Sequence, residues 1–136
     1  MPTIVIKIRQ RELPAPKNPE MDFEWFCRSL GLVGPRDAQM TTSRVFKAIV
    51  MATKRYGGIS IPELVEVLGL SRTAVVHHLQ EIWDTGLLTK DGMRFRLRRY
   101  NIKSTVEEIE QDLNRIFERI KKMAEDVDEE LGFPSR

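Results

Sequence analysis

The sequence predicts a mainly α-helical fold with a small β wing, and three features of its 136 residues support this prediction. Residues 60–84 contain the start and stop signals of two short helices joined by a glycine-containing turn. Residues 89–99 alternate apolar and basic side chains after an Asp-Gly pair, which is typical of a β-hairpin. Residues 104–131 repeat apolar side chains at steps of three and four, which is typical of a long helix. Together these elements predict a winged helix-turn-helix domain with a long C-terminal dimerisation helix.

The first of the two short helices has clear end signals. Ser60 and Glu63 have the spacing of a capping box, and Pro62 falls in the first turn, where a missing N–H costs little. Gly69 can end the helix in a left-handed conformation, and Ser71 can cap the next one. A capped helix, a turn with glycine and a second capped helix form a helix-turn-helix signature.

The second short helix, residues 71–84, has two different faces. At about 100° per residue, Val75, Leu79 and Ile82 cluster on one side and are expected to face the core. The opposite side and its flanks carry polar groups that can bond to bases and phosphates in a major groove. These residues are Thr73, His77, Gln80 and Asp84, flanked by Arg72 and Val76. An ordinary solvated helix face is the alternative. We expect His78 to be a hydrogen-bonded packing residue and Trp83 to pack in the core or at its edge.

The segment after this helix predicts a basic hairpin. Residues 89–92 contain the Asp-Gly pair that favours a tight two-residue turn. Beyond it, Met93, Phe95 and Leu97 are expected on one face, and Arg94, Arg96 and Arg98 on the other. Like charges on one face repel each other, so such a face suits a polyanion better than water. With Lys90 at the tip and Arg99 nearby, the hairpin is interpreted as a wing that contacts phosphates.

The stretch LSRTAVVHHLQEIWDTGLL resembles the recognition-helix region of the ArsR-type winged-helix repressors. Those repressors run Leu-Ser-x-x-x-Val-Ser-His-His-Leu and end in a Gly-Leu pair before the wing. The matching residues are Leu70, Ser71, Val75, His77, His78, Leu79, Gly86 and Leu87. Val76 stands where the family usually has serine, which removes one phosphate or base contact. The resemblance covers about residues 42–131, is strongest over 60–99, and implies a dimeric DNA-binding regulator.

These observations predict a sequence-specific regulator of transcription that binds double-stranded DNA. Residues 71–84 would enter the major groove as the recognition helix, and residues 89–99 would lie on the phosphate backbone. The alternative is a winged helix that binds protein, or a general transcription factor component without sequence-specific readout. The operator, the target genes, the direction of regulation and any small ligand or protein partner stay open. The expected DNA-binding residues are Ser71, Arg72, Thr73, Val76, His77, Gln80, Lys90, Arg94, Arg96 and Arg98.

No cofactor, metal or catalytic residue is expected. Metal sensors of the ArsR type carry a Cys-x-Cys cluster, or Asp and His ligands on the last helix, and neither pattern occurs. Cys27 is the only cysteine, and His77 and His78 are the only histidines, whereas a metal site usually needs three or four suitably spaced ligands. Cys27 is therefore interpreted as a buried small hydrophobe. The sequence contains no Gly-rich phosphate loop or nucleophile elbow, so the chain is not expected to be an enzyme.

Composition and charge agree with a DNA-binding domain. One cysteine and the lack of a long apolar run or signal-peptide pattern predict a cytoplasmic protein without a membrane span. Residues 1–103 hold 17 Lys and Arg against 10 Asp and Glu, while residues 104–136 hold 5 against 10. The small net charge of +2 therefore combines a basic body with an acidic tail. Nucleic acid is expected to meet the body and not the tail.

The C-terminal segment predicts a dimerisation helix. Ser104 and Glu107 have capping-box spacing, Gly132 can end the helix, and the apolar stripe between them resembles a coiled-coil seam. The N-terminal part of the stripe could pack on the body and the C-terminal part on a second copy. A two-fold dimer would place two recognition helices about 34 Å apart, which is one turn of DNA. After Val106, the expected interface residues are Ile109, Leu113, Ile116, Ile120, Met123 and Val127.

Three segments are expected: an N-terminal extension (1–40), the winged domain (41–100) and the C-terminal amphipathic helix (101–136). In the extension, residues 3–9 alternate as in a strand, and Pro14, Pro16 and Pro19 predict a stiff linker. Residues 22–30 predict a short helix closed by Gly31. The aromatic side chains Phe23, Trp25 and Phe26 are expected to pack on the body, with a ligand pocket or partner surface as the alternative. The winged domain is expected to begin with a helix that starts at Thr42 or Ser43.

Overall fold

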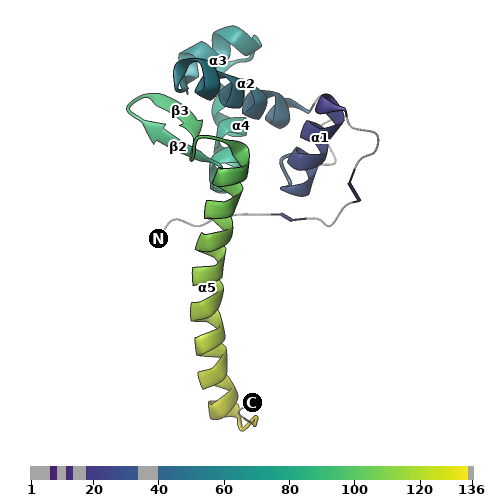
Figure 1. Ribbon diagram of the computed structural model, residues 1–136. Helices are drawn as coiled ribbons and strands as arrows, with labels where there is room; N and C mark the ends of the chain where they lie inside the picture. The colour runs from purple at the N-terminus through teal and green to yellow at the C-terminus, as the bar shows by residue number, and fades with distance from the viewer. Residues whose placement is uncertain (1–6, 9–11, 14–17, 34–39, 135–136) are drawn as a thin grey trace.

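The computed structural model describes residues 7–8, 12–13, 18–33 and 40–134, and this part of the chain is mainly helical with a small antiparallel sheet. A body of short elements lies at one end of a long helix, which extends well beyond it (Figure 1). None of the described helices is long and apolar enough to cross a membrane. In chain order the elements are α1 (Pro19–Ser29), α2 (Thr41–Tyr56), β1 (Ile59–Ser60), α3 (Ile61–Leu68), α4 (Arg72–Asp84), β2 (Leu88–Asp91), β3 (Arg94–Leu97) and α5 (Ile102–Leu131).

The core of the body lies between α2, α3 and α4. Each helix contributes fully buried apolar side chains, which are Val45, Phe46 and Ile49 from α2, Leu64 from α3, and Val75 and Ile82 from α4. The angular reading of residues 71–84 is therefore confirmed for its core face. The end signals of α3 are also confirmed, because Ser60 and Glu63 form a capping box and Gly69 takes φ of +67°.

Helix α1 shares this core. The rings of Phe23 and Phe26 stack on Phe46 with centroid separations of 5.7 and 6.2 Å, and Cys27 is completely buried. The predicted packing of these two aromatic residues on the body is confirmed. The predicted helix start was wrong by three residues. Asn18 caps the helix by accepting from the backbone N–H groups of the second and third helical residues, so Pro19 belongs to the first turn and not to a linker.

The predicted N-terminal strand and most of the proline-rich linker lie outside the described residues. Of the expected strand, Lys7 and Ile8 are described and have no regular secondary structure. Helix α2 begins at Thr41, one residue before the expected start, and its cap position Met40 has φ of +53°.

The sheet has the strand order β1-β3-β2, and all pairs are antiparallel. Strand β1 was not predicted, because it has only two residues, of which Ser60 is also the cap of α3, and so short a strand gives no alternation to detect. Gly58 lets β1 approach β3, since a Cβ there would lie 2.9 Å from the Phe95 carbonyl oxygen. The hairpin turn was predicted one residue too early. Asp91 pairs with Arg94, so the turn residues are Gly92 and Met93, with Gly92 at φ of +62°.

Helix α5 begins on the body and then leaves it (Figure 1). Thr105 and Ile109 are buried against the body, whereas every side chain from Phe117 to the end of the helix is exposed. The predicted Ser104 cap was wrong: Asn101 is the cap, and its side-chain oxygen accepts from the Ser104 backbone N–H at 2.8 Å. The end at Gly132 is confirmed, with φ of +84°.

Candidate nucleic-acid interface

The outer face of α4 carries a row of exposed side chains. Because the helix buries Val75, Leu79 and Ile82, the residues opposite them must face solvent. The hydroxyl of Ser71 is used as the cap, accepting from the Ala74 backbone N–H at 3.1 Å. The expected base-reading residues on this face are all exposed, and they are Arg72, Thr73, Val76, His77 and Gln80.

Two of these side chains have acidic neighbours on the same helix. His77 Nε2 lies 3.1 Å from a carboxylate oxygen of Glu81, and the Gln80 amide donates to Asp84 at 2.8 Å. Both pairs are four residues apart, as expected for neighbours on a helix surface. Binding a base edge would require His77 and Gln80 to give up these contacts. The sequence reading placed Asp84 on this face but did not anticipate the contacts.

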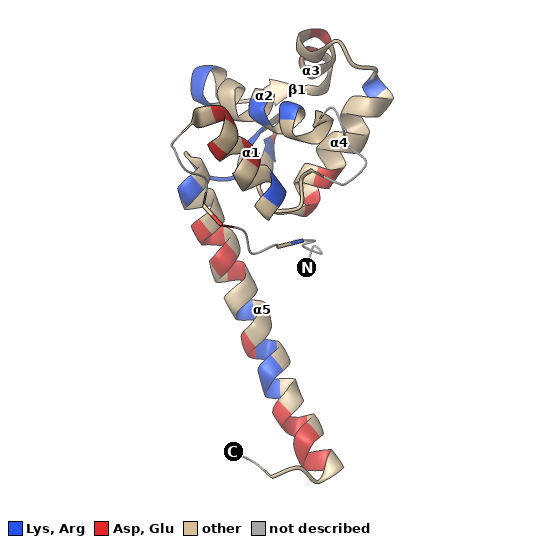
Figure 2. Cartoon of the chain, turned by 90° about the vertical axis from the view of Figure 1, so that its right-hand side faces the viewer, with Lys and Arg blue, Asp and Glu red and all other residues tan. Residues whose placement is uncertain are grey.

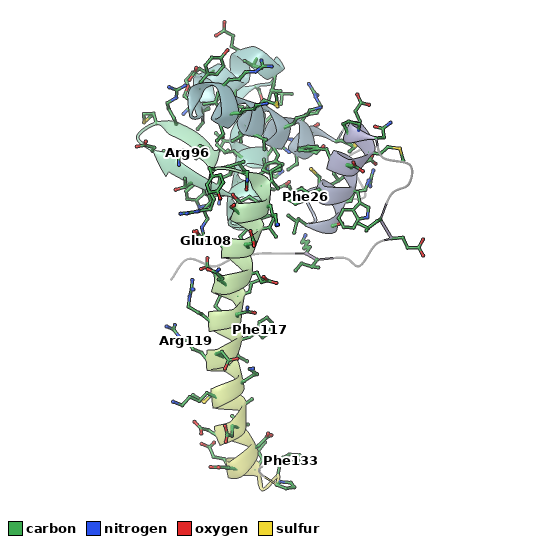
Figure 3. All side chains as sticks on the ribbon, in the orientation of Figure 1. Phe26, Arg96, Glu108, Phe117, Arg119 and Phe133 are labelled. Carbon is green, nitrogen blue, oxygen red and sulfur yellow. The ribbon has the colours of Figure 1, made fainter. Side chains whose placement is uncertain are left out.

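Of the basic side chains of the hairpin, Lys90 lines a hollow together with α4, whereas Arg94 and Arg96 lie beside Gly58. Phe95 and Leu97 of β3 face the core, so Arg94 and Arg96 lie on the other side of the strand, as predicted (Figure 3). Arg94 donates to the Gly58 carbonyl oxygen at 3.0 Å, and Arg96 is half-buried with no hydrogen-bond partner for its Nε. Met93 was expected on the apolar face, but it lies in the turn and is 75% exposed.

The ion pairs separate Arg98 from the rest of the basic hairpin. Arg98 contacts Glu108 and Asp112 of α5, each at 2.6 Å, so its role as a phosphate contact is corrected. Burial lowers the pKa of Arg98, but hydrogen bonds and charges of Asp112 and Glu108 outweigh it and raise the pKa overall. Within the described part of the chain, Arg72, Lys90, Arg94 and Arg96 form no ion pair with an acidic side chain.

A hollow of 250 Å³ separates α4 from the hairpin, and its walls are mostly apolar. The Trp83 ring meets the Phe95 ring edge-on at 6.0 Å, and the Lys90 ammonium lies 5.3 Å from the same Phe95 ring. Trp83 was expected either in the core or at its edge. It packs at the edge, where its side chain is 39% exposed. Sequence reasoning missed this hollow, since its walls come from the four elements α3, α4, β2 and β3. The lining residues are Ile61, Val76, Leu79, Gln80, Trp83, Lys90 and Phe95.

The groups best placed to hold a metal ion are His77, His78 and Glu81, whose ligand atoms lie within 4.8 Å of one another. Each of these groups already has a hydrogen-bond partner. The hydroxyl of Thr42 on α2 lies 2.7 Å from His78 Nδ1 and donates to Glu81 at 2.9 Å, while Glu81 also contacts His77. The cluster is therefore a network that joins α2 to α4. It confirms His78 as a hydrogen-bonded packing residue.

The thiol of Cys27 is buried and unreactive. Burial, together with the charge of Glu24, raises its pKa to about 12, so the reactive thiolate is scarce near neutral pH. The interpretation of Cys27 as a small buried hydrophobe is confirmed.

The predicted dimer residues divide into two groups. Ile109 is 5% exposed within the core, and Leu113 packs partly against it, so the assignment of Ile109 to an interface is corrected. Further along, Ile120, Met123 and Val127 are 54%, 61% and 41% exposed, and Ile116 is half-buried. Acidic residues gather at both ends of α5, with basic residues between them (Figure 2). The acidic far end of α5 projects away from α4 and the hairpin (Figures 1 and 2), whereas the acidic residues near its start include the Arg98 partners Glu108 and Asp112.

Comparison with known proteins gives no relative for this chain. No family model, no curated protein and no solved structure matches it.

Proposed function

We propose that residues 41–100 form a winged helix-turn-helix domain that binds double-stranded DNA, and that the chain regulates transcription as a homodimer. In this proposal α4 lies in the major groove as the recognition helix, and the hairpin of β2 and β3 lies on the adjacent phosphate backbone. The observation that carries it is that α4 exposes a polar face while four basic side chains of α4 and the hairpin form no ion pair with an acidic side chain of the described residues. Those side chains are Arg72, Lys90, Arg94 and Arg96.

The division of labour follows from the chemistry of each group. Guanidinium and ammonium groups bind phosphate and supply affinity and register, whereas the side chains of Thr73, His77 and Gln80 can bond to base edges. Ser71 lies at the start of α4, where free backbone N–H groups favour binding of an anion such as a phosphate. Arg98 has no part in this surface, because it pairs with α5.

The second candidate is a winged helix that binds a protein segment. The hollow lined by Val76, Trp83 and Phe95 favours it, since exposed apolar walls suit an apolar side chain better than a phosphate. The contacts of His77 with Glu81 and of Gln80 with Asp84 point the same way. The four basic side chains that form no ion pair with a described acidic residue favour DNA, and we therefore rank DNA binding first.

Selection of binding sites from a random pool of duplexes tests the proposal. The full-length chain should enrich a defined sequence, and Gln80→Ala should relax the preference at one or two base pairs by roughly 1–3 kcal/mol each. Gln111→Ala, which removes the same amide from the exposed side of α5, should leave the enriched sequence unchanged. A pool that stays random with the wild-type chain would favour the protein-binding alternative.

A further inference from the structure

The far half of α5 carries an apolar stripe that the described chain leaves uncovered. Phe117, Ile120, Met123 and Val127 are between 41% and 61% exposed, and they follow the spacing of one helix face. A row of large apolar side chains in water is unusual for a monomer and indicates a partner. The proposed homodimer makes a second copy of α5 the occupant of this stripe. The direction in which that copy runs is a separate question.

Charge along this half of α5 has a direction. Residues 115–122 carry four basic and one acidic side chain, while residues 123–130 carry five acidic and no basic ones (Figure 2). In a parallel pair each block would lie beside its own copy, so like charges would repel. In an antiparallel pair whose midpoint lies near residue 122, the basic block of each helix lies beside the acidic block of the other.

We propose that two copies of α5 pair antiparallel over residues 113–130, and this inference rests on the homodimer of the proposed function. Placing the midpoint between Lys121 and Lys122 aligns the exposed apolar residues with one another. Ile116 then meets Val127 of the partner subunit, and Ile120 meets Met123 of the partner subunit. By symmetry each contact occurs twice. The four residues of the seam, Ile116, Ile120, Met123 and Val127, are therefore all covered by the same four residues of the other copy.

The positions beside the seam discriminate between the two directions. Phe117 and Arg119 project on opposite sides of α5 (Figure 3). In the antiparallel pair Arg119 lies beside Asp126 of the partner subunit on one side, and Phe117 lies beside Ala124 of the partner subunit on the other. A parallel pair would instead place Arg119 beside alanine and Asp126 beside leucine, by the usual pairing of flanking positions. The antiparallel direction therefore gains two opposite-charge pairs.

This direction changes how the dimer would meet DNA. Each α5 begins at Ile102. In the antiparallel pair the Ile102 residues of the two copies lie on opposite sides of the midpoint, about 58 Å apart along the helix axis. The two winged domains would then sit at opposite ends of a rod. The spacing of about 34 Å expected for adjacent half-sites suits a parallel dimer better, so antiparallel pairing predicts half-sites further apart than one turn of DNA.

Disulfide cross-linking of the full-length chain tests the direction. Cys27→Ala supplies a cysteine-free background, to which Ile116→Cys or Val127→Cys is added. When the two variants are mixed and oxidised, we expect a disulfide between one copy of each, identified by intact mass. Ile116→Cys alone should not cross-link, because its two copies would be about 16 Å apart along the axis and a disulfide needs Cα atoms closer than about 7 Å.

Each other outcome overturns the inference in a different way. A cross-link of Ile116→Cys with itself shows a parallel pair and leaves the proposed homodimer standing. A dimer that forms neither cross-link shows that α5 does not pair in this register. A monomer by light scattering removes the homodimer as well, while DNA binding is measured separately.

A charge exchange gives a second measurement that does not depend on cysteine. Arg119→Asp alone or Asp126→Arg alone should raise the dimer Kd about tenfold, since each places like charges together at two symmetric sites. The double variant Arg119→Asp/Asp126→Arg should restore the Kd. If the two single effects simply add in the double variant, the two side chains do not meet across the dimer.

Discussion

At the scale of single residues, Arg98 joins the end of the hairpin to α5. Its guanidinium bonds to two carboxylates at 2.6 Å, and the Asp112 side chain is only 14% exposed. Removing the arginine would take a charge-assisted hydrogen bond from each of the two carboxylates, leaving, among the described residues, Asp112 only its contact with Arg115 and Glu108 only its contact with Arg99. The pair therefore holds α5 at a defined angle to the body.

We expect Arg98→Ala to lower the free energy of unfolding by about 1.5–3 kcal/mol, the usual range for hydrogen bonds to charged groups. Urea denaturation followed by circular dichroism measures this loss. The same variant should keep the wild-type salt dependence of DNA binding, because Arg98 does not face the proposed phosphate contacts. A normal stability with a reduced salt dependence would return Arg98 to the DNA surface.

At the scale of elements, the helices were more predictable than the turns. The two ends of α3 and the core face of α4 depend on local signals, such as the Ser60–Glu63 spacing and the positions of Val75 and Leu79. The hairpin turn was misplaced by one residue because both Asp91-Gly92 and Gly92-Met93 can form a two-residue turn, and the pairing of Asp91 with Arg94 selects the second.

The candidate site shows the same limit. Sequence periodicity could place Arg94, Arg96 and Arg98 on one strand face, but it could not show that Glu108 and Asp112 come back to neutralise one of them. Those carboxylates lie on a helix that the sequence assigned to dimerisation. The sequence did not reveal the hollow beside Trp83 for the same reason, since it forms only when four elements are packed together.

The cap of α5 gives a prediction at this scale. Asn101→Ala should lower the free energy of unfolding by about 1 kcal/mol, because the cap accepts a backbone N–H that would otherwise lack a partner. Ser104→Ala is the matched control, and it should change stability by only a few tenths of a kcal/mol. Thermal unfolding of both variants decides between the two caps; equal losses would mean that Asn101 is not the dominant one.

At the scale of the whole molecule, the proposed function gives DNA binding to the body and dimerisation to the projecting helix, whose far end is acidic (Figure 2). The first part of α5 packs on the body through Thr105 and Ile109, so the body and the exposed far half of the helix can be altered independently. The proposed dimer depends on the free half alone.

Ile120→Asp should therefore abolish the dimer while the body stays folded, because two aspartates would face each other's apolar seam at symmetric sites. Light scattering should give a mass near 15.8 kDa for the variant and twice that for the wild type. Glu118→Asp, on the outer side of the helix, should remain dimeric. A wild-type chain that is already monomeric would show that the stripe has a different partner.

Loss of the dimer should also weaken DNA binding steeply. Two linked domains hold the second half-site at high local concentration, and a monomer loses that advantage. Binding of Ile120→Asp to a selected site, measured by fluorescence anisotropy, should therefore fall by about a hundredfold or more. An unchanged affinity would mean that one domain binds the whole site.

The most direct test of DNA binding through the hairpin is the salt dependence of affinity for Arg94→Gln/Arg96→Gln. With two phosphate contacts removed, we expect weaker binding to all duplexes alike and a slope of log K against log salt that is shallower by about 2. Arg94→Lys/Arg96→Lys, which keeps both charges, should retain most of the slope. Lys121→Ala/Lys122→Ala, which removes the same charge from α5, should retain all of it. Wild-type affinity and slope in the Arg94→Gln/Arg96→Gln chain would contradict the account and favour a protein partner for this surface.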